Sequence, residues 1–347
     1  MVIRIHNKVS GYVLLFSILL IISGCTHPFG EQMDNTPLGN FRALWTIIDE
    51  KYCYMEEKGI NWDSVYSVYY PQFDTIRVTK DEDNRAVFYL MEKMISLLKD
   101  GHVNLYSPFD TSSMYNSLLE GYPENFDFGI LTQYYLTQKN YQQANGLNYC
   151  KIDGDSIGYV YYSSFLNSFS LTDWLSVLDY FSDCKGIVLD VRNNTGGYIE
   201  NAYKLASPFF TRDTVVGYWQ HKSGSKHQDF SDLKAMYITH SQGWWKRPVV
   251  VLCNRHIFSA ANFFVSIMRY ADNCLILGGK SCGGGGIPMS YELPNGWVFR
   301  FSSVRIFDRD LQSLENGVTP QVIVNQQSTD KDDLIEKAIE LIHSAYK

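Results

Sequence analysis

The chain has 347 residues and a formal net charge of −7, so it is long enough for one large domain and a smaller one. Hydrophobic residues make up 45% of it and charged residues 19%, a globular composition that excludes a disordered chain. No Lys/Arg cluster supplies the basic face that phosphate binding needs, so we expect no nucleic-acid partner.

The N-terminus has the organisation of a bacterial signal peptide. Two basic residues precede an apolar run over 12–22, which is too short for a transmembrane helix, and small residues follow it. The segment Ile22-Ser23-Gly24-Cys25 resembles a lipobox, in which Cys25 becomes the lipidated first residue of the mature protein. We predict a lipoprotein signal peptide over 1–24 and a lipid anchor on Cys25 in the bacterial cell envelope, facing the periplasm or the cell surface. An uncleaved anchor or an ordinary secretory peptide is the alternative.

The other cysteines are scattered along the chain. They form no CxxC pair and no Cys/His ligand spacing, so we predict neither a metal site nor a cofactor. An exported chain permits disulfides. Cys253, at the end of an apolar strand, is nevertheless expected to be a buried thiol.

The polar segment 25–37 is predicted to be a tether, and the pattern after it is helical. Apolar residues recur at i, i+3 and i+4 over 41–52, and further helices are expected over about 62–70 and 85–98. We assign residues 38–107 to an N-terminal helical domain.

Residues 108–155 are expected to form a strand-rich connection without a clear repeat. Beyond them, apolar strands alternate with amphipathic helices. The strands are expected at 157–165, 185–191, 248–254 and 274–279, and the helices at 171–182, 199–209, 259–271 and 332–345. This alternation predicts a layered α/β core over 156–347.

Ser259 lies at the junction between the strand PVVVLCN and the helix AANFFVSIMRYA. A serine at this position can cap the helix, because its side chain accepts a hydrogen bond from an unpaired backbone N–H. It can also present a nucleophilic hydroxyl, since some catalytic serines lie on such turns. The residues around Ser259 leave both interpretations open.

Further residues could complete a catalytic site. Gly196-Gly197 follows a buried strand, so its backbone N–H groups could bind an oxyanion, although an isolated glycine pair also makes a plain tight turn. His102 is a natural general base near neutral pH, and Glu315 could orient a histidine. His256 is a second candidate base that we favour as a loop histidine.

Asp190 and Arg192 flank the end of the strand before the glycine pair. They could simply form an ion pair.

Six motifs occur in one order along the chain: DGH, LDVRNNTGG, FSAANFF, LGGKSCGGGG, ELPNG and ENGVTP. Together they resemble the C-terminal-processing and tricorn-core family of serine peptidases, from about Phe41 to Val324. The segment FRALWTIIDEKYCYMEEKGINWDSVYSVYY is similar to the helical start of tricorn-core-like bacterial members. The resemblance implies a crotonase-like (ClpP/crotonase) ββα superhelix core with an N-terminal helical domain.

The resemblance also implies roles for individual residues. Ser259 would be the nucleophile, and the oxyanion hole would combine the N–H of Ala260 with an N–H of Gly196 or Gly197. A helix N-terminus and a glycine turn both offer unpaired donors, which agrees with this assignment.

One branch of the family uses a Ser-Lys dyad, and this chain departs from it. Gly284 stands where the dyad lysine should be, Lys280 lies earlier in the turn and is expected to be structural, and Asn262 replaces a frequent glutamate. The tricorn-like branch uses a histidine and a glutamate, which correspond here to His102 and Glu315.

In tricorn a serine precedes that histidine, and Gly101 stands there in this chain. The relay from Glu315 to His102 could therefore be direct or could run through water.

We therefore expect a lipid-anchored serine peptidase, an endo- or exopeptidase acting on peptides or unfolded proteins. A catalytically inactive lipoprotein that binds peptides or lipids on the same fold is the alternative. An acyl-CoA enzyme of the crotonase type is disfavoured, because an exported chain has no CoA supply. About 45 residues connect DGHVNLYSP to the core, half of what a PDZ domain needs, so we predict no PDZ domain.

Overall fold

The computed structural model describes residues 33–78, 80–137, 141–240 and 245–345. The predicted signal peptide, the predicted lipidation site Cys25 and most of the predicted tether lie outside the described residues. No helix in these described ranges combines the length and the apolar character that a membrane span requires.

The predicted helices and strands of the core appear in the predicted order, but residues 128–135, in the connection expected to be strand-rich, are helical, and the strands at 214–221 and 234–238 were not predicted. The longer helices are α1 (Pro37–Lys51), α2 (Trp62–Thr75), α3 (Asp81–Ile95), α5 (Leu171–Tyr180), α6 (Ile199–Ala206), α7 (Ala260–Met268) and α8 (Asp333–Ser344). The short helical turns are η1 (Ser96–Leu98), η2 (Asn116–Leu118), α4 (Phe128–Ile130), η3 (Leu131–Tyr135), η4 (Ser207–Phe209) and η5 (Leu314–Asn316). The strands are β1 (Asn104–Tyr106), β2 (Gln142–Ala144), β3 (Leu147–Ile152), β4 (Ile157–Tyr162), β5 (Gly186–Asp190), β6 (Thr214–His221), β7 (Lys234–Ile238), β8 (Val249–Cys253), β9 (Cys274–Gly278), β10 (Gly286–Glu292), β11 (Val298–Asp308) and β12 (Val322–Ile323).

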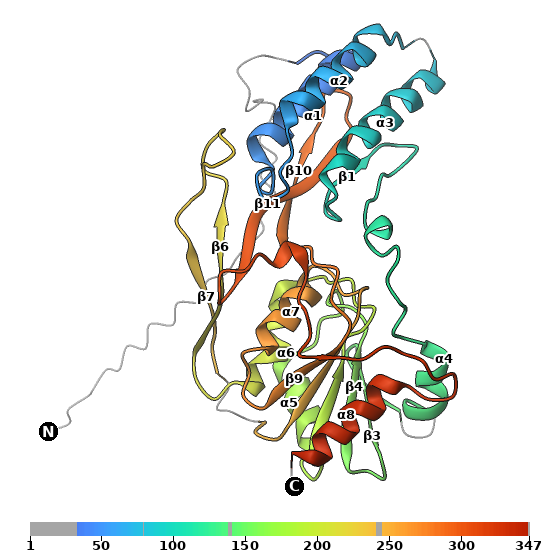
Figure 1. Ribbon diagram of the computed structural model, residues 1–347, viewed down its shortest axis with the longest axis vertical. Coiled ribbons are helices and arrows are strands. Elements are labelled where there is room, and N and C mark those ends of the chain that lie inside the picture. Colours follow the sequence, from blue (N-terminus) through green and yellow to red (C-terminus); the bar gives the residue numbers. More distant parts are fainter. Residues whose placement is uncertain (1–32, 79, 138–140, 241–244, 346–347) are drawn as a thin grey trace, which may run out of the picture.

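The lower part of the molecule in Figure 1 is a seven-stranded sheet covered on both faces. Its order is β12-β9-β8-β5-β4-β3-β2, and the strands from β12 to β4 pair in parallel. Alternate residues of β5 face opposite ways, so Ile187 and Leu189 pack with α5, α6 and α7 while Val188 packs with α8. The predicted α/β arrangement is confirmed, although β2 and β3 of the same sheet lie before residue 156, where the core was predicted to begin.

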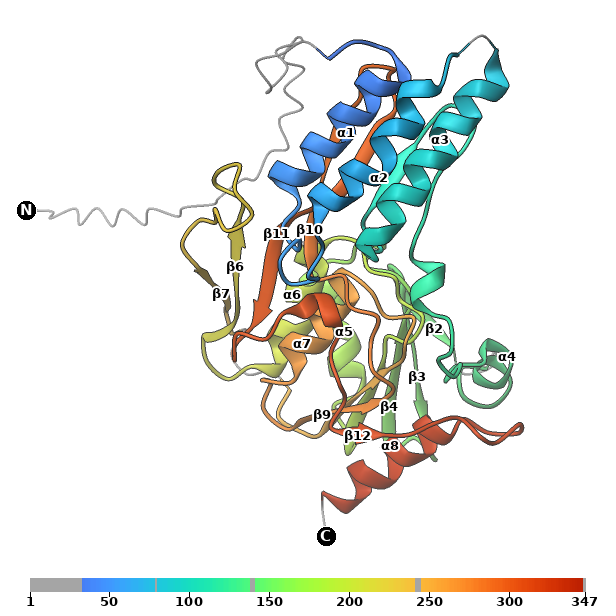
Figure 2. The same ribbon diagram turned by 45° about the horizontal axis from the view of Figure 1, so that its top comes forward.

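The upper part contains α1, α2 and α3, but these helices do not close a core by themselves (Figure 2). The hairpin β10–β11 packs against them, and Leu293, Trp297, Phe299 and Phe301 belong to the same buried cluster as the helices. The predicted helical domain over 38–107 therefore omits part of this unit. Hydrophobic periodicity places each strand face, yet it does not reveal which distant element that face covers.

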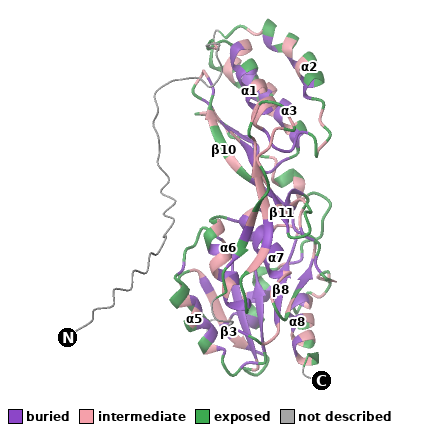
Figure 3. Cartoon of the chain, turned by 90° about the vertical axis from the view of Figure 1, so that its left-hand side faces the viewer, coloured by how far each residue is buried: buried purple, intermediate pink, exposed green. Residues whose placement is uncertain are grey.

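Strand β11 also connects the two parts of the molecule (Figure 3). Its first residues pair with β1 and its last residues pair with β6. Phe299 and Phe301 are buried in the upper core, whereas Ile306 is buried with α5, α6 and α7. One continuous strand therefore sets how the upper unit sits on the sheet below.

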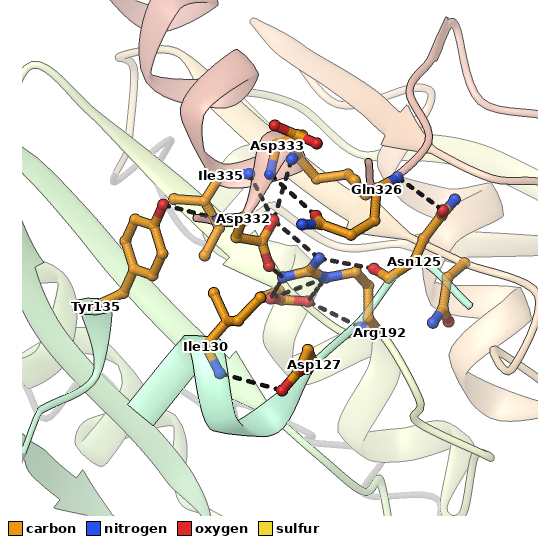
Figure 4. A network of polar contacts seen from close by, with 12 residues as sticks. Asn125, Asp127, Ile130, Tyr135, Arg192, Gln326, Asp332, Asp333 and Ile335 are labelled. Atoms are coloured by element: carbon orange, nitrogen blue, oxygen red, sulfur yellow. Dashed lines mark hydrogen bonds and ion pairs between the residues drawn. The ribbon is translucent and has the colours of Figure 1, made fainter. Parts of the chain in front are cut away.

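A buried ionic network holds the C-terminal end of β5 (Figure 4). Arg192 is fully buried, and its Nη2 atom lies 2.6 Å from Asp190 and 2.8 Å from Asp332, the residue that caps α8. Its Nη1 atom donates to the carbonyl of Asn125, and Asp190 also accepts the hydroxyl of Tyr159. The expected Asp190–Arg192 ion pair is confirmed, and it anchors the glycine turn that follows it.

Replacing Arg192 by methionine should destabilise the protein strongly. The carboxylates of Asp190 and Asp332 would stay buried without their cation, a change that typically costs about 3–5 kcal/mol. Urea unfolding measures the loss. Lys151→Met is the control, because it breaks an ion pair whose Asp183 side chain is 68% exposed and should cost about 0–1 kcal/mol. Equal losses in the two variants would contradict the anchoring role of the network.

Candidate active site

Ser259 lies between β8 and α7, as predicted, but its side chain does not cap the helix. Its backbone has φ 55° and ψ −125°, a region that favours glycine, and its N–H donates to the carbonyl of Gly283. The Oγ atom lies instead 3.1 Å from Nε2 of His102. Residues held in unfavourable backbone regions cluster at functional sites, so the geometry favours the nucleophile over the cap.

His102 reaches the serine from the upper unit, on the loop between η1 and β1. Its backbone N–H donates to Asp100 Oδ1 at 2.7 Å, and Tyr52 donates its hydroxyl to the other oxygen of the same carboxylate. The imidazole is buried, and no described residue forms a hydrogen bond with its Nδ1 atom. The loop is thus fixed through Asp100, while Nε2 faces Ser259.

The surroundings of His102 keep its imidazole neutral. Burial lowers the pKa of His102 from 6.5 to about 4; the negative charge of Asp100 acts in the opposite direction, and the cations Arg300 and Lys58 lower the pKa further. Near pH 7 the ring is therefore unprotonated. This is the form that can accept a proton from a serine hydroxyl.

Glu315 lies beside this loop but makes no direct hydrogen bond to His102. Its Oε1 atom lies 2.7 Å from Nζ of Lys58, and its Oε2 atom accepts the N–H of Gly285. Burial raises the pKa of Glu315 to about 8, with help from Asp100 and against the attraction of Lys58. The orienting role of Glu315 stays a prediction, and Lys58 is its partner in the structure.

The glycine turn after β5 lies directly against the serine. A Cβ atom on Gly196 would lie 2.8 Å from Cβ of Ser259, so only glycine permits this approach. The N–H of Gly196 donates to the side chain of Asn194, whereas no described residue accepts the N–H of Gly197 or Ala260. Of the predicted oxyanion donors, the N–H groups of Gly197 and Ala260 can therefore bind an oxyanion, whereas the N–H of Gly196 is hydrogen-bonded within its own turn.

The ring of Phe258 explains why a Ser-Lys dyad has no room here. It packs on the imidazole of His102 with ring centroids 4.6 Å apart. A Cβ atom on Gly284 would lie 2.2 Å from this ring, and a Cβ atom on Gly101 would lie 2.7 Å from it. Neither a lysine at 284 nor a serine at 101 fits unless the ring moves.

The remaining candidates lie outside the serine–histidine contact. His256 accepts the hydroxyl of Tyr115 at its backbone carbonyl, and its ring takes part in no hydrogen bond among the described residues. Lys280 is exposed. In the ranges that the structure describes, no three potential metal ligands cluster.

Asn262 and Ser281 position the turn that carries Glu315. Asn262 donates to the carbonyl of Leu314 and accepts the hydroxyl of Ser281, which in turn accepts the N–H of Val318. The sequence pattern assigns these two residues no role, and it does not single out Lys58 or Phe258. The available signal was an aromatic residue next to the serine together with glycines at 101 and 284.

Comparisons with known proteins decide the family. Residues 156–324 match peptidase family S41, and residues 33–96 match the C1 domain of tricorn protease. A crystal structure of a candidate peptidase from Parabacteroides merdae is 37% identical, with a TM-score of 0.83 over 89% of this chain and 97% of that chain. The chain belongs to peptidase family S41, a family of serine peptidases.

Other relatives are more distant. Carboxy-terminal processing protease CtpB of Bacillus subtilis is 26% identical over 179 residues, which are 51% of this chain and 35% of CtpB. The chain thus spans about a third of the length of the curated relatives that match it first. The structure of mature CPAF is 12% identical and covers 88% of this chain and 96% of that chain with a TM-score of 0.65, a likeness of fold alone.

Phe258→Ala should move the acid limb of the pH–rate profile to higher pH. Removing the ring admits water to His102, so the pKa of His102 rises from about 4 toward its ordinary 6.5. Because the base must be unprotonated, activity should then be lost as pH falls through the higher pKa.

The measurement is kcat/KM for a peptide between pH 4 and 8, with circular dichroism to check folding. Phe258→Leu is the control, since it keeps most of the apolar cover and should leave the limb near its original position. An unmoved limb in the alanine variant would show that Phe258 does not set the environment of His102.

Proposed function

We propose that this protein hydrolyses peptide bonds through an acyl-enzyme on Ser259, with His102 as the general base. The observation that carries the proposal is the 3.1 Å contact between Ser259 Oγ and His102 Nε2. These residues are 157 positions apart and come from different units of the molecule. The alternation of parallel strands and helices on the lower sheet also fits the crotonase-like core that the family resemblance implies.

The geometry supports the following reaction. Neutral His102 accepts the proton of the Ser259 hydroxyl while Oγ attacks the carbonyl carbon of the substrate. The N–H groups of Gly197 and Ala260 stabilise the oxygen anion of the tetrahedral intermediate. The C–N bond then breaks, His102 gives its proton to the leaving amine, and a water molecule hydrolyses the ester by the same steps.

A catalytically inactive peptide- or lipid-binding protein on the same fold is the second candidate. One observation favours it: no described residue bonds to Nδ1 of His102, and the carboxylate of Glu315 binds Lys58 instead. An imidazole without an orienting acid is a weaker catalyst.

Ser259→Gly distinguishes the two candidates. The side chain of Ser259 caps nothing and its φ is positive, so glycine should leave the melting temperature unchanged or raise it slightly. Peptide hydrolysis and labelling by a fluorophosphonate probe should both disappear. A variant that melts normally and still cleaves peptides would remove Ser259 from the mechanism.

Two histidine variants complete this experiment. His102→Ala should lower turnover by about two to four powers of ten, the usual contribution of a general base. His256→Ala is the matched control and should retain wild-type turnover, because its ring makes no hydrogen bond among the described residues.

We also propose that the protein is anchored in the cell envelope by a lipid on Cys25. The support is the sequence alone: a basic start, a short apolar run and the segment Ile22-Ser23-Gly24-Cys25. Cys25→Ala should release the protein from the membrane fraction or leave its signal peptide uncleaved. A variant that fractionates and migrates like the wild type would refute the anchor.

A further inference from the structure

Asp100 is a buried carboxylate beside the general base, and the reaction proposed above gives it no part. It lies two residues before His102 and has no exposed surface. Its Oδ1 atom accepts the backbone N–H of His102 at 2.7 Å, and its Oδ2 atom accepts the hydroxyl of Tyr52 at 3.1 Å. Both donors are neutral groups. No cationic side chain in the described ranges forms an ion pair with Asp100, so its negative charge has no counter-charge in contact with it.

Glu315, to which the family resemblance assigns the acidic role, is in a different situation. Lys58 lies 2.7 Å from its Oε1 atom, and the N–H of Gly285 donates to its Oε2 atom. Both oxygens are therefore engaged away from His102. Because an ammonium group is in contact with this carboxylate, the pair acts on its surroundings as a dipole rather than as a net negative charge.

The charges around His102 come from several elements. Burial, the largest effect, lowers the pKa of His102; Asp100 raises it, whereas Arg300 on β11 and Lys58 in the turn between α1 and α2 lower it further. Glu315 in η5, the other carboxylate at this junction, is paired with Lys58. Asp100 is therefore the described side chain whose charge favours a protonated imidazole.

The base needs this support at one point of the reaction. When the proton of the Ser259 hydroxyl moves to Nε2 of His102, the ring becomes a cation in a buried site, where an isolated charge is costly. A negative charge nearby stabilises this cation through space, while the proton stays on the imidazole until it passes to the leaving amine.

We propose that Asp100, rather than Glu315, supplies the negative charge that stabilises protonated His102 during the reaction; the inference rests on the proposed function. Asp100 acts through His102, so it is a positioning residue. The same carboxylate holds the loop by the N–H of His102 and offsets the charge of the ring. This role explains how the base can work although no described residue bonds to its Nδ1 atom.

The test separates the charge of Asp100 from its hydrogen bonds. In Asp100→Asn the amide oxygen still accepts the N–H of His102, and the amide nitrogen can donate to the oxygen of Tyr52. Asp127→Asn is the matched control. Asp127 is exposed, and its Oδ1 atom likewise accepts a backbone N–H two residues further on, that of Gly129, at 2.7 Å.

The measurements are kcat and KM for a peptide, the pH–rate profile, and the affinity for a peptide boronic acid. A boronic acid forms a tetrahedral adduct on a catalytic serine and so mimics the intermediate in which His102 carries the proton. Asp100→Asn should lower kcat and the boronic acid affinity by about ten- to a hundredfold and leave KM within about twofold.

The acid limb of the pH–rate profile gives a readout that a structural defect would not move. Asp100 raises the pKa of His102, so the pKa falls below about 4 when this charge is removed. Because the base must be unprotonated, the lowered activity of Asp100→Asn should persist to lower pH than that of the wild type. Asp127→Asn should match the wild type in every measurement.

A double variant tests Glu315 independently of Asp100. Lys58→Met with Glu315→Gln removes both members of the ion pair without changing the net charge, and it should lower the boronic acid affinity by less than about tenfold. A loss of about a hundredfold in this folded variant would assign the supporting charge to Glu315 and overturn the proposal, even if Asp100→Asn does not fold. Circular dichroism checks the folding of each variant.

Equal boronic acid affinities for Asp100→Asn and Asp127→Asn, or an acid limb that stays in place, would also overturn the proposal. In these cases an active wild-type protein would leave the proposed reaction intact. A wild-type protein that neither cleaves peptides nor binds the boronic acid would refute the proposed reaction, and the role of Asp100 with it.

Discussion

Strand β11 imposes the constraint on which the site depends, because it is shared by two hydrophobic cores. Phe299 and Phe301 pack with α1 to α3, and Ile306 packs with α5 to α7. The same strand pairs with β1, which begins two residues after His102. A slip of one residue in this pairing would turn every side chain of the strand to the other face. The register of β11 therefore places His102 against a serine that belongs to the other unit.

Burial of this junction has opposite effects on its two titratable groups. It lowers the pKa of His102, so the imidazole is neutral and able to accept a proton. It raises the pKa of Glu315, which favours the protonated carboxyl group. Lys58 opposes the second effect, because its ammonium group lies 2.7 Å from the carboxylate. Lys58 also adds to the lowering of the His102 pKa. One lysine thus helps to set the charge state of both groups without touching the serine.

The sequence predicted most of the core elements and the serine–histidine pair better than the contacts between elements. Strong periodicity identified the long helices and the buried strands, and the order of six motifs singled out Ser259 and His102. The place of the β10–β11 hairpin was missed, because its pairing with β1 and β6 joins positions that are far apart in the chain. The direction of the Gly196 N–H was also beyond prediction. It depends on a peptide plane at φ +101°, a conformation that glycine permits but does not impose.

Phe258 shows why two departures from the family belong together: Gly284 stands where the dyad branch has a lysine, and Gly101 stands where tricorn has a serine. A lysine at 284, a serine at 101 and the ring of Phe258 would compete for one volume, since the ring lies within 3 Å of a Cβ atom at either glycine. Once the ring is present, both positions must stay without side chains, and a proton acceptor has to enter from another direction. His102 does so, with its imidazole tilted by 45° against the ring and its Nε2 atom toward Ser259. The two glycines, read separately from the sequence, looked like two losses. In the structure they are the space that one aromatic side chain requires in order to bury the base.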